Sequence, residues 1–294
     1  MMAYNAGVDT GFVAVSPLTE CHANNNTTTN YSLGSFAMRR IIFILAVFVP
    51  LAFLFCATAT AAEGPKKISV LLIAGDDLAP AHNWRKISEA TRDVLINSGR
   101  FDVRVCEDPM ILESKKALDR YDVIVFTMFN STLPTISDEA KANLLEFVTG
   151  GKGFYVQHLA SKSFKEWEGF GKLCGRKWIA GISGHGPRKV FEAKITDTDH
   201  PITKGMKNFK VSDELYAKLQ GDSPINVLVT GDSEWSKKTE PLLFTLQYGR
   251  GRVVHNAFGH DTKAINNADV QRLIARGVEW AATGSVADAD SKMP

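Results

Sequence analysis

Thr149-Gly-Gly-Lys-Gly-Phe-Tyr-Val-Gln-His158-Leu-Ala-Ser161 is the stretch that decides the fold. A helical segment ends at Gly150 and Gly151, and the apolar run from 154 to 156 follows them as a buried strand. His158 stands where this strand ends. Ligands of open parallel sheets bind at the carboxyl ends of the strands. The layout therefore predicts an α/β protein with His158 in its functional site.

The chain before this stretch has the same alternation of strands and helices. Apolar, β-branched runs predict strands at 68–74, 101–106 and 123–126. Apolar residues at helical spacing predict a helix at 84–97, and Ser137 is the expected N-cap of a second helix that ends at Gly150. This alternation is typical of a doubly wound parallel sheet.

The chain after the stretch is richer in strands. Its predicted elements are a short helix at 164–173, a glycine-rich loop at 179–187, strands at 190–195, 226–230, 242–248 and 252–257, and a closing helix at 268–281. The glycines of Tyr248-Gly-Arg-Gly-Arg252 supply the turn that joins the last two strands as a hairpin.

The first 62 residues are expected to lie outside the folded domain. Residues 1–37 are polar and predict a disordered extension or, with translation from Met38, a stretch outside the protein. From Met38, two arginines, an apolar run and small residues up to Ala62 predict a signal peptide over 38–62. The apolar run is somewhat short for a spanning helix, which needs roughly 20 residues. With Met1 as the true start, an uncleaved membrane anchor is the alternative.

The mature protein is predicted to be one exported domain over 63–285, periplasmic or secreted, with a polar disordered tail over 286–294. After cleavage we expect no contact with a membrane. The formal net charge is +2 and no basic run is interleaved with aromatic residues, which argues against a nucleic-acid partner. The oligomeric state stays open.

Several familiar motifs are missing from the sequence. It has no P-loop, no G-x-G-x-x-G after a strand and no G-x-S-x-G elbow, so we expect neither a nucleotide cofactor nor a serine nucleophile. Cys106 and Cys174 lack the spacing of a metal finger, and they are either free or paired as a disulfide.

Histidines supply the main functional signal. Four of them lie in loops or at strand ends and are expected to meet at one edge of the sheet: His82, His158, His185 and His260. Converging imidazoles suit a divalent metal such as zinc, for which the predicted ligands are His158, His185 and His260. They also suit acid–base chemistry near neutral pH. The alternative is that each is a polar loop residue bound to backbone. His200 and His255 are interpreted as structural.

The predicted catalytic residues are His158, His260, Asp213 and Glu214. Neighbouring residues of an extended segment point to opposite sides, so only one of the two carboxylates should enter a cleft. A solvated loop is the alternative for both. The predicted substrate-binding residues are His82, Trp84, Gln157, Tyr216 and Asp261. Among them, Trp84 and Tyr216 would stack on a sugar ring, although packing in the core is the alternative for such rings.

Five separated motifs together resemble the ThuA-like (trehalose-utilisation) family. They are Gly150–His158, Asp199–Gly205, Val211–Tyr216, Tyr248–Arg252 and Phe258–Asp261, and the resemblance runs from about Ile68 to Ala282. It implies a flavodoxin-like or class I glutamine amidotransferase-like fold, a three-layer sandwich with a mostly parallel central sheet.

The resemblance also implies a role in carbohydrate metabolism, with a disaccharide or keto-sugar as the small-molecule partner. In the related amidotransferases a cysteine occupies the turn after the strand, whereas here His158 stands near that position. The amidotransferase reaction is therefore not expected. The hypotheses are an enzyme with histidine and carboxylate acid–base chemistry and metal assistance (a hydrolase or lyase on sugars), a non-catalytic sugar-binding or scaffold domain, and an accessory subunit of a sugar oxidoreductase.

Overall fold

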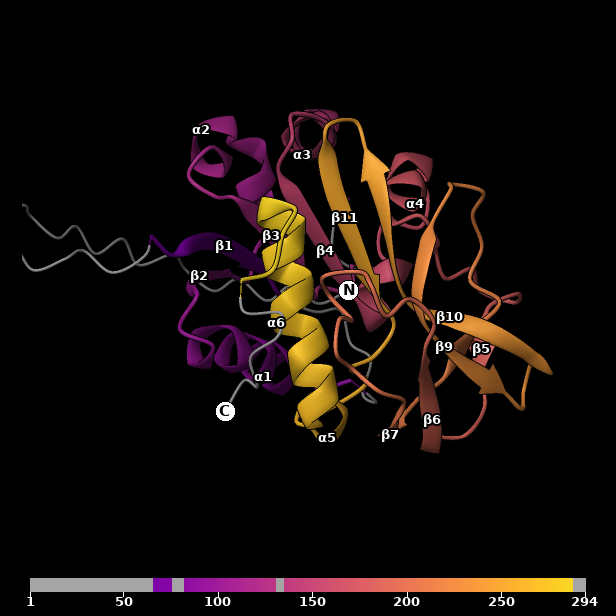
Figure 1. Cartoon of the computed structure of the whole chain (residues 1–294). Helices are drawn as coiled ribbons and strands as arrows, with labels where there is room; N and C mark the ends of the chain where they lie inside the picture. The colour runs from indigo at the N-terminus through magenta and orange to yellow at the C-terminus, as the bar shows by residue number, and fades with distance from the viewer. Residues whose placement is uncertain (1–65, 76–81, 131–134, 288–294) are drawn as a thin grey trace, which may run out of the picture. The chain divides into compact units, whose positions relative to one another are not determined.

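The computed structural model describes residues 66–75, 82–130 and 135–287. Its strands are β1 (Ile68–Ile73), β2 (Phe101–Cys106), β3 (Val123–Phe126), β4 (Gly153–Gln157), β5 (Gly184–His185), β6 (Lys189–Ile195), β7 (Phe209–Asp213), β8 (Tyr216–Ala217), β9 (Asn226–Ser233), β10 (Lys238–Tyr248) and β11 (Gly251–Asn256). Nine of them form one sheet in the order β2-β1-β3-β4-β11-β10-β9-β6-β7 (Figure 1). The predicted extension and signal peptide, and the end of the predicted tail, lie outside the described residues.

The sheet is only partly parallel, which corrects the prediction of a mostly parallel one. The strands from β2 to β11 pair in parallel, whereas β10, β9, β6 and β7 continue the sheet in antiparallel pairs. The parallel half has the order β2-β1-β3-β4-β11. A hairpin produces the change of direction, because β10 and β11 are joined by the predicted tight turn at Gly249, whose φ is +61°.

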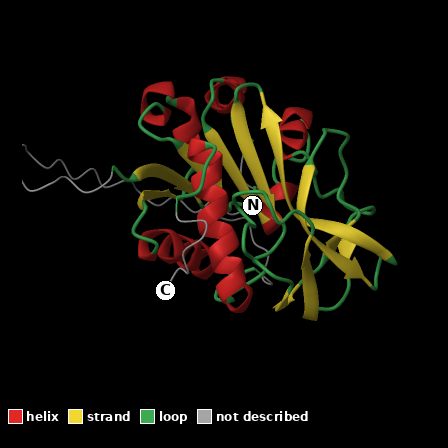
Figure 2. Cartoon of the chain, viewed as in Figure 1, coloured by secondary structure: helices red, strands yellow, loops and turns green. Residues whose placement is uncertain are grey.

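Helices cover both faces of the sheet (Figure 2). One face packs against α1 (Trp84–Asn97), α5 (Thr262–Ile265) and α6 (Ala268–Thr283). The other packs against the 3-10 helix η1 (Pro109–Glu113) and against α2 (Lys115–Leu118), α3 (Asp138–Thr149) and α4 (Glu168–Cys174). Two separate hydrophobic cores result, one on each face, so the α/β class predicted from the sequence is confirmed.

The N-cap and the apolar spacing predicted from the sequence are those that α3 has in the structure. The Ser137 hydroxyl accepts a hydrogen bond from the Ala140 N–H at 3.0 Å, and α3 ends at Gly150. The residues of α3 that face the core are the predicted stripe, Ala140, Leu144, Phe147 and Val148. This helix and β4 therefore bring His158 to the carboxyl end of a central strand.

Two predictions for the second half need correction. The loop expected at 179–187 contains the short strand β5, which pairs with β8 as a second sheet. The short helix expected at 164–173 is confined to α4. The 3-10 helix η2 (His158–Lys162) precedes it, and Phe164 between them has a φ of +49°, which a right-handed helix does not contain. Cys106 and Cys174 are free. Among the described residues, no helix has both the length and the apolar character that crossing a bilayer demands.

His255 gives the fold a pH-dependent stability. Burial lowers the pKa of His255 to about 4, from 6.5, although its Nδ1 lies 3.0 Å from the Cys174 carbonyl oxygen. Below pH 6.5 the unfolded chain therefore takes up a proton that the folded protein does not. The free energy of unfolding therefore decreases as pH drops from 6.5 to about 4, by roughly 3 kcal/mol over this whole range.

We expect the His255→Gln variant, whose amide can still donate to Cys174, to lose this part of the pH dependence. Urea unfolding at pH 7.0, 5.5 and 4.5 would show a shallower decline of the unfolding free energy than in the wild type. Equal slopes would contradict the assignment, whatever the stability of the variant at pH 7.

Candidate metal centre

His158 lies in an unusual backbone conformation at the end of β4. Its φ is +48°, in the left-handed region that non-glycine residues rarely adopt. Its Nδ1 lies 2.7 Å from the Ala257 carbonyl oxygen, so Nδ1–H donates and Nε2 carries the lone pair. Tyr216 stacks on the ring with centroids 4.0 Å apart. Backbone, hydrogen bond and stack together fix one direction for the Nε2 atom.

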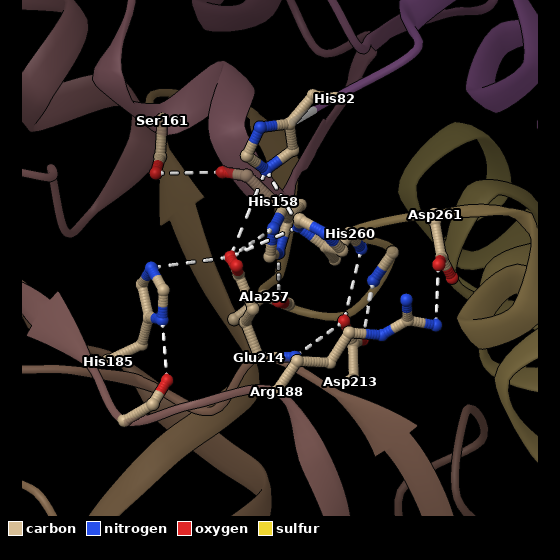
Figure 3. A network of polar contacts seen from close by, with 12 residues as sticks. His82, His158, Ser161, His185, Arg188, Asp213, Glu214, Ala257, His260 and Asp261 are labelled. Atoms are coloured by element: carbon tan, nitrogen blue, oxygen red, sulfur yellow. Dashed lines mark hydrogen bonds and ion pairs between the residues drawn. The ribbon is translucent and has the colours of Figure 1, made fainter. Parts of the chain in front are cut away.

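Glu214 reaches the same place from the connection between β7 and β8. Its side chain is buried beside the histidines, whereas that of the preceding Asp213 turns into the backbone (Figure 3). Asp213 accepts hydrogen bonds from the N–H groups of Gly259 at 2.8 Å, Glu214 at 2.8 Å and His260 at 3.1 Å. One of the two carboxylates thus enters the site, as predicted. The contacts of Asp213 fit a positioning role rather than the predicted catalytic one.

A single carboxylate oxygen, Oε2 of Glu214, is the centre of the cluster. It lies 3.2 Å from His260 Nδ1, 3.6 Å from His158 Nε2 and 3.9 Å from His82 Nε2 (Figure 3). The four ligand atoms all lie within 4.8 Å of one another. His82, His158, Glu214 and His260 can therefore hold a metal ion.

The four atoms have the spacing of ligands around one ion. With metal–nitrogen bonds of about 2.0–2.1 Å, neighbouring ligand atoms lie roughly 3–4 Å apart. His158 Nε2 and Glu214 Oε2 are buried and have no hydrogen-bond partner within the protein. Burial without a partner is costly for such atoms. An ion bound between them would satisfy both.

Electrostatics supplies the protonation states that a metal needs. Burial, followed by the neighbouring His158 and His260, lowers the pKa of His82 to about 3, so its imidazole is neutral at pH 7. Burial raises the pKa of Glu214, but the imidazoles of His158 and His260 outweigh it and keep this pKa well below its ordinary value. Metal ligands must be neutral imidazoles and ionised carboxylates. His260 differs, because Glu214 raises its pKa.

His185 lies beside the cluster and not within it. Its Nε2 is 3.5 Å from Glu214 Oε2, and its Nδ1 lies 2.7 Å from the Gly186 carbonyl oxygen. It is not one of the four residues whose ligand atoms lie within 4.8 Å of one another. The predicted metal set of His158, His185 and His260 thus changes: His82 and Glu214 belong to the cluster, and His185 lies outside it.

A small cavity of about 20 Å³ opens beside His82 and His158. Its walls include Trp84 and Gln157, two of the predicted substrate-binding residues, together with Thr127 and Phe129, for which the sequence held no signal beyond their place after β3. This volume is about that of one water molecule. The described cavity therefore suits the reacting group of a ligand.

Tyr216 and Asp261 do not line this cavity. Tyr216 is buried against His158 and Trp178, so packing accounts for its ring. Asp261 accepts from the Ala264 N–H at the start of α5 and forms an ion pair with Arg188. Outside the cluster, His200 packs on Trp280 and His255 lies in the other core, as expected for structural histidines.

Solved structures of other proteins have the same fold as this chain. A ThuA-like protein from Parabacteroides merdae is 28% identical, with a TM-score of 0.66, over 76% of this chain and 92% of that one. A ThuA-like protein from Bacteroides uniformis is 16% identical, with a TM-score of 0.60, over 77% and 98%. A cytoplasmic protein from Salmonella typhimurium, 15% identical with a TM-score of 0.53 over 74% and 100%, shares the fold alone.

No functionally curated protein matches the sequence. The family model named ThuA and described as "Trehalose utilisation" matches residues 69–281, nearly all of the described chain. This match confirms the resemblance seen in the five sequence motifs. The chain belongs to the ThuA family, which is linked to trehalose utilisation.

Proposed function

We propose that the protein is a metal-dependent enzyme that acts on a sugar or keto-sugar. The observation that carries this proposal is the burial of three imidazole nitrogens around Glu214 Oε2, with all four ligand atoms within 4.8 Å. Zinc is the proposed ion, because imidazole and carboxylate are among its common ligands. The four residues would hold the ion, and a ligand in the cavity would reach it beside His82 and His158, which line that cavity.

The chemistry we propose is proton transfer beside a carbonyl group. The bound ion would polarise the carbonyl oxygen and stabilise the negative charge that forms on it. His185 lies outside the ligand set with its Nε2 3.5 Å from Glu214 Oε2, and this proximity supports it as the residue that would remove or return a proton. Positioned proton transfer typically accelerates a reaction about 10²–10⁴-fold.

The family supports carbohydrate as the substrate class, since its description is trehalose utilisation. The cavity lined by Trp84, Phe129, Thr127 and Gln157 has a water-sized volume, so in this proposal only the reacting group of the sugar enters it. Residues 38–62 favour export, and we propose a periplasmic or secreted location; detection of the mature N-terminus near residue 63 in the exported fraction would check it.

The proposed function predicts metal-dependent turnover of a keto-glycoside. We expect the full-length protein, loaded with Zn²⁺, to convert at least one member of a keto-glycoside panel, and a chelator to stop it. His158→Ala and His260→Ala should each lose about 100-fold in kcat/KM, whereas His200→Ala, outside the cluster, should not change it.

Unchanged turnover in both His158→Ala and His260→Ala would contradict the proposal that the protein is an enzyme. Saturable sugar binding, seen as a rise in melting temperature without turnover of any substrate, would instead favour a non-catalytic sugar-binding domain. Co-purification with a sugar oxidoreductase without activity of its own would favour an accessory subunit.

A further inference from the structure

The strand β2 forms an open edge of the large sheet. It stands first in the strand order, and among the described residues it pairs with β1 alone (Figure 1). A strand at the edge of a sheet presents a row of N–H and C=O groups that have no partner in the sheet. Such a row is a template on which a further strand can pair. The question is therefore which strand fits this edge.

The backbone groups of β2 divide between its two sides. The carbonyl oxygen of Cys106 accepts a hydrogen bond from the N–H of Ala74, directly after β1, at 2.9 Å. Successive residues of a strand direct their N–H and C=O groups to alternate sides. The backbone groups that point away from β1 are therefore those of Phe101, Val103 and Val105.

Two side chains of β2 carry opposite charges at alternate positions. Asp102 and Arg104 are exposed, by 57% and 71%, and their charged atoms lie 3.8 Å apart. Charged side chains often keep an edge strand from pairing. Here the two charges have opposite signs, so a second β2 that runs in the opposite direction presents the complementary order of charges. The edge is self-complementary in charge.

A second copy of β2 fits the edge in one register. Antiparallel pairing about a twofold axis at Val103 places Val103 opposite its own counterpart and Phe101 opposite Val105. These are the residues whose backbone groups point outward, so both copies supply the donors and acceptors of the new ladder. Asp102 then lies opposite Arg104 of the second copy, at the positions without ladder bonds, where the Cα atoms are about 4.5 Å apart and side chains are closest. Opposite charges that face each other there stabilise a sheet.

Exposed apolar side chains occur around the same edge. Six large apolar side chains are exposed in the described chain, and three of them belong to the segment 96–110: Ile96, Val105 and Met110. Ile96 lies at the end of α1, shortly before β2, and Met110 lies in η1, shortly after it. Pairing of two copies would cover Val105, which is 42% exposed. Burial of apolar surface favours association.

We propose that the protein forms a symmetric dimer through β2, in which the sheets of two copies join edge to edge in this register. The partner is a second copy of this chain, because the order of Asp102 and Arg104 complements itself about a twofold axis. The parallel strands of the two copies run in opposite directions, so their carboxyl ends, and with them the two metal clusters, lie on opposite sides of the joined sheet. The dimer is therefore independent of the proposed function.

The test is sedimentation equilibrium of the full-length protein from about 1 to 100 µM, a range that suits a small interface. We expect the mass to rise from 32.2 kDa toward twice this value. Asp102→Arg and Arg104→Asp each place like charges opposite each other, and each should raise the Kd of the dimer at least about tenfold. The double variant, with both exchanges, restores opposite charges and should dimerise like the wild type.

Lys194→Asp is the matched control. Lys194 is also exposed and paired with an aspartate, Asp232, but it lies on β6, near the other end of the sheet. This variant should dimerise like the wild type. A dimer that the single reversals leave unchanged, or that they weaken no more than Lys194→Asp does, would overturn the assignment to β2. So would a double variant that stays monomeric although it melts at the temperature of the wild type.

Hydrogen exchange of the wild type gives a readout that needs no variant. The N–H groups of Val103 and Val105 should exchange more slowly at about 100 µM than at about 1 µM, because the second copy supplies their partners. A monomer over the whole range would overturn the proposal. Slow exchange of these groups in such a monomer would show, in addition, that another segment of the same chain covers β2.

Discussion

The Glu214→Gln variant is expected to lose about 1000-fold in affinity for Zn²⁺, together with any metal-dependent turnover. The Glu214 carboxylate would be the one anionic ligand of the ion, and its Oε2 lies within 3.2–3.9 Å of three ligand nitrogens. Glutamine keeps the shape and removes the charge. Even at an effective dielectric constant of about 20, the attraction between a carboxylate and a divalent ion at bonding distance exceeds the ~4 kcal/mol that a 1000-fold loss represents.

Competition with a fluorescent chelator would measure the affinity, and elemental analysis would give the metal content. Glu240→Gln is a matched control, because Glu240 is also a buried carboxylate but lies on β10, outside the cluster. The control should bind Zn²⁺ like the wild type. Equal affinities in the wild type and in Glu214→Gln would exclude Glu214 as a ligand.

The Asp213→Asn variant is expected to lose about 100-fold in metal affinity without losing a ligand. Asp213 is fully buried, and its carboxylate holds the backbone N–H groups of two cluster residues, Glu214 and His260. An asparagine places an N–H₂ group either at Oδ1, which accepts from Glu214 and His260, or at Oδ2, which accepts from Gly259, the residue before His260. Replacing a residue that orients a metal ligand commonly lowers metal affinity by 10–100-fold. We expect the upper end of this range because Asp213 positions two ligands.

Loss of stability is expected as well, of about 3 kcal/mol, since at least one buried N–H would lose its partner. The affinity should therefore be measured well below the melting temperature. The absorption spectrum of the Co²⁺-loaded protein gives a readout that stability alone would not move, because it reports ligand geometry. Asp197→Asn is the control: Asp197 also accepts backbone N–H groups, from Asp199 and His200, but far from the site. An unchanged spectrum and affinity in Asp213→Asn would contradict the positioning role.

Much of the fold could be predicted because its signals are local. The strand ending before His158, the cap at Ser137 and the buried stripe of α3 follow from residue spacing within a few turns of chain. The antiparallel half of the sheet could not be predicted in the same way. The direction in which two strands pair depends on connections and registers between segments far apart in the sequence, and an alternating run is compatible with either direction.

The candidate site was predicted in part. The position of four histidines in loops or at strand ends indicated that they would meet, and the alternation of an extended chain indicated that one carboxylate of Asp213 and Glu214 would enter. Spacing alone could not say which of the two enters, because that depends on how the end of β7 is oriented relative to the histidines.

The amino-acid sequence by itself determined the α/β class, the family motifs and the chemical types available at the strand ends, because periodicity and residue type are properties of short stretches. Only the tertiary structure decided that His82 and Glu214 complete the cluster that can hold a metal and that His185 stays outside it. The physical reason is distance: His82 and His260 are 178 residues apart in the chain, yet their nitrogens lie 3.0 Å apart in the folded protein. Such a separation is set by the packing of the sheet and its connections, which no local pattern specifies.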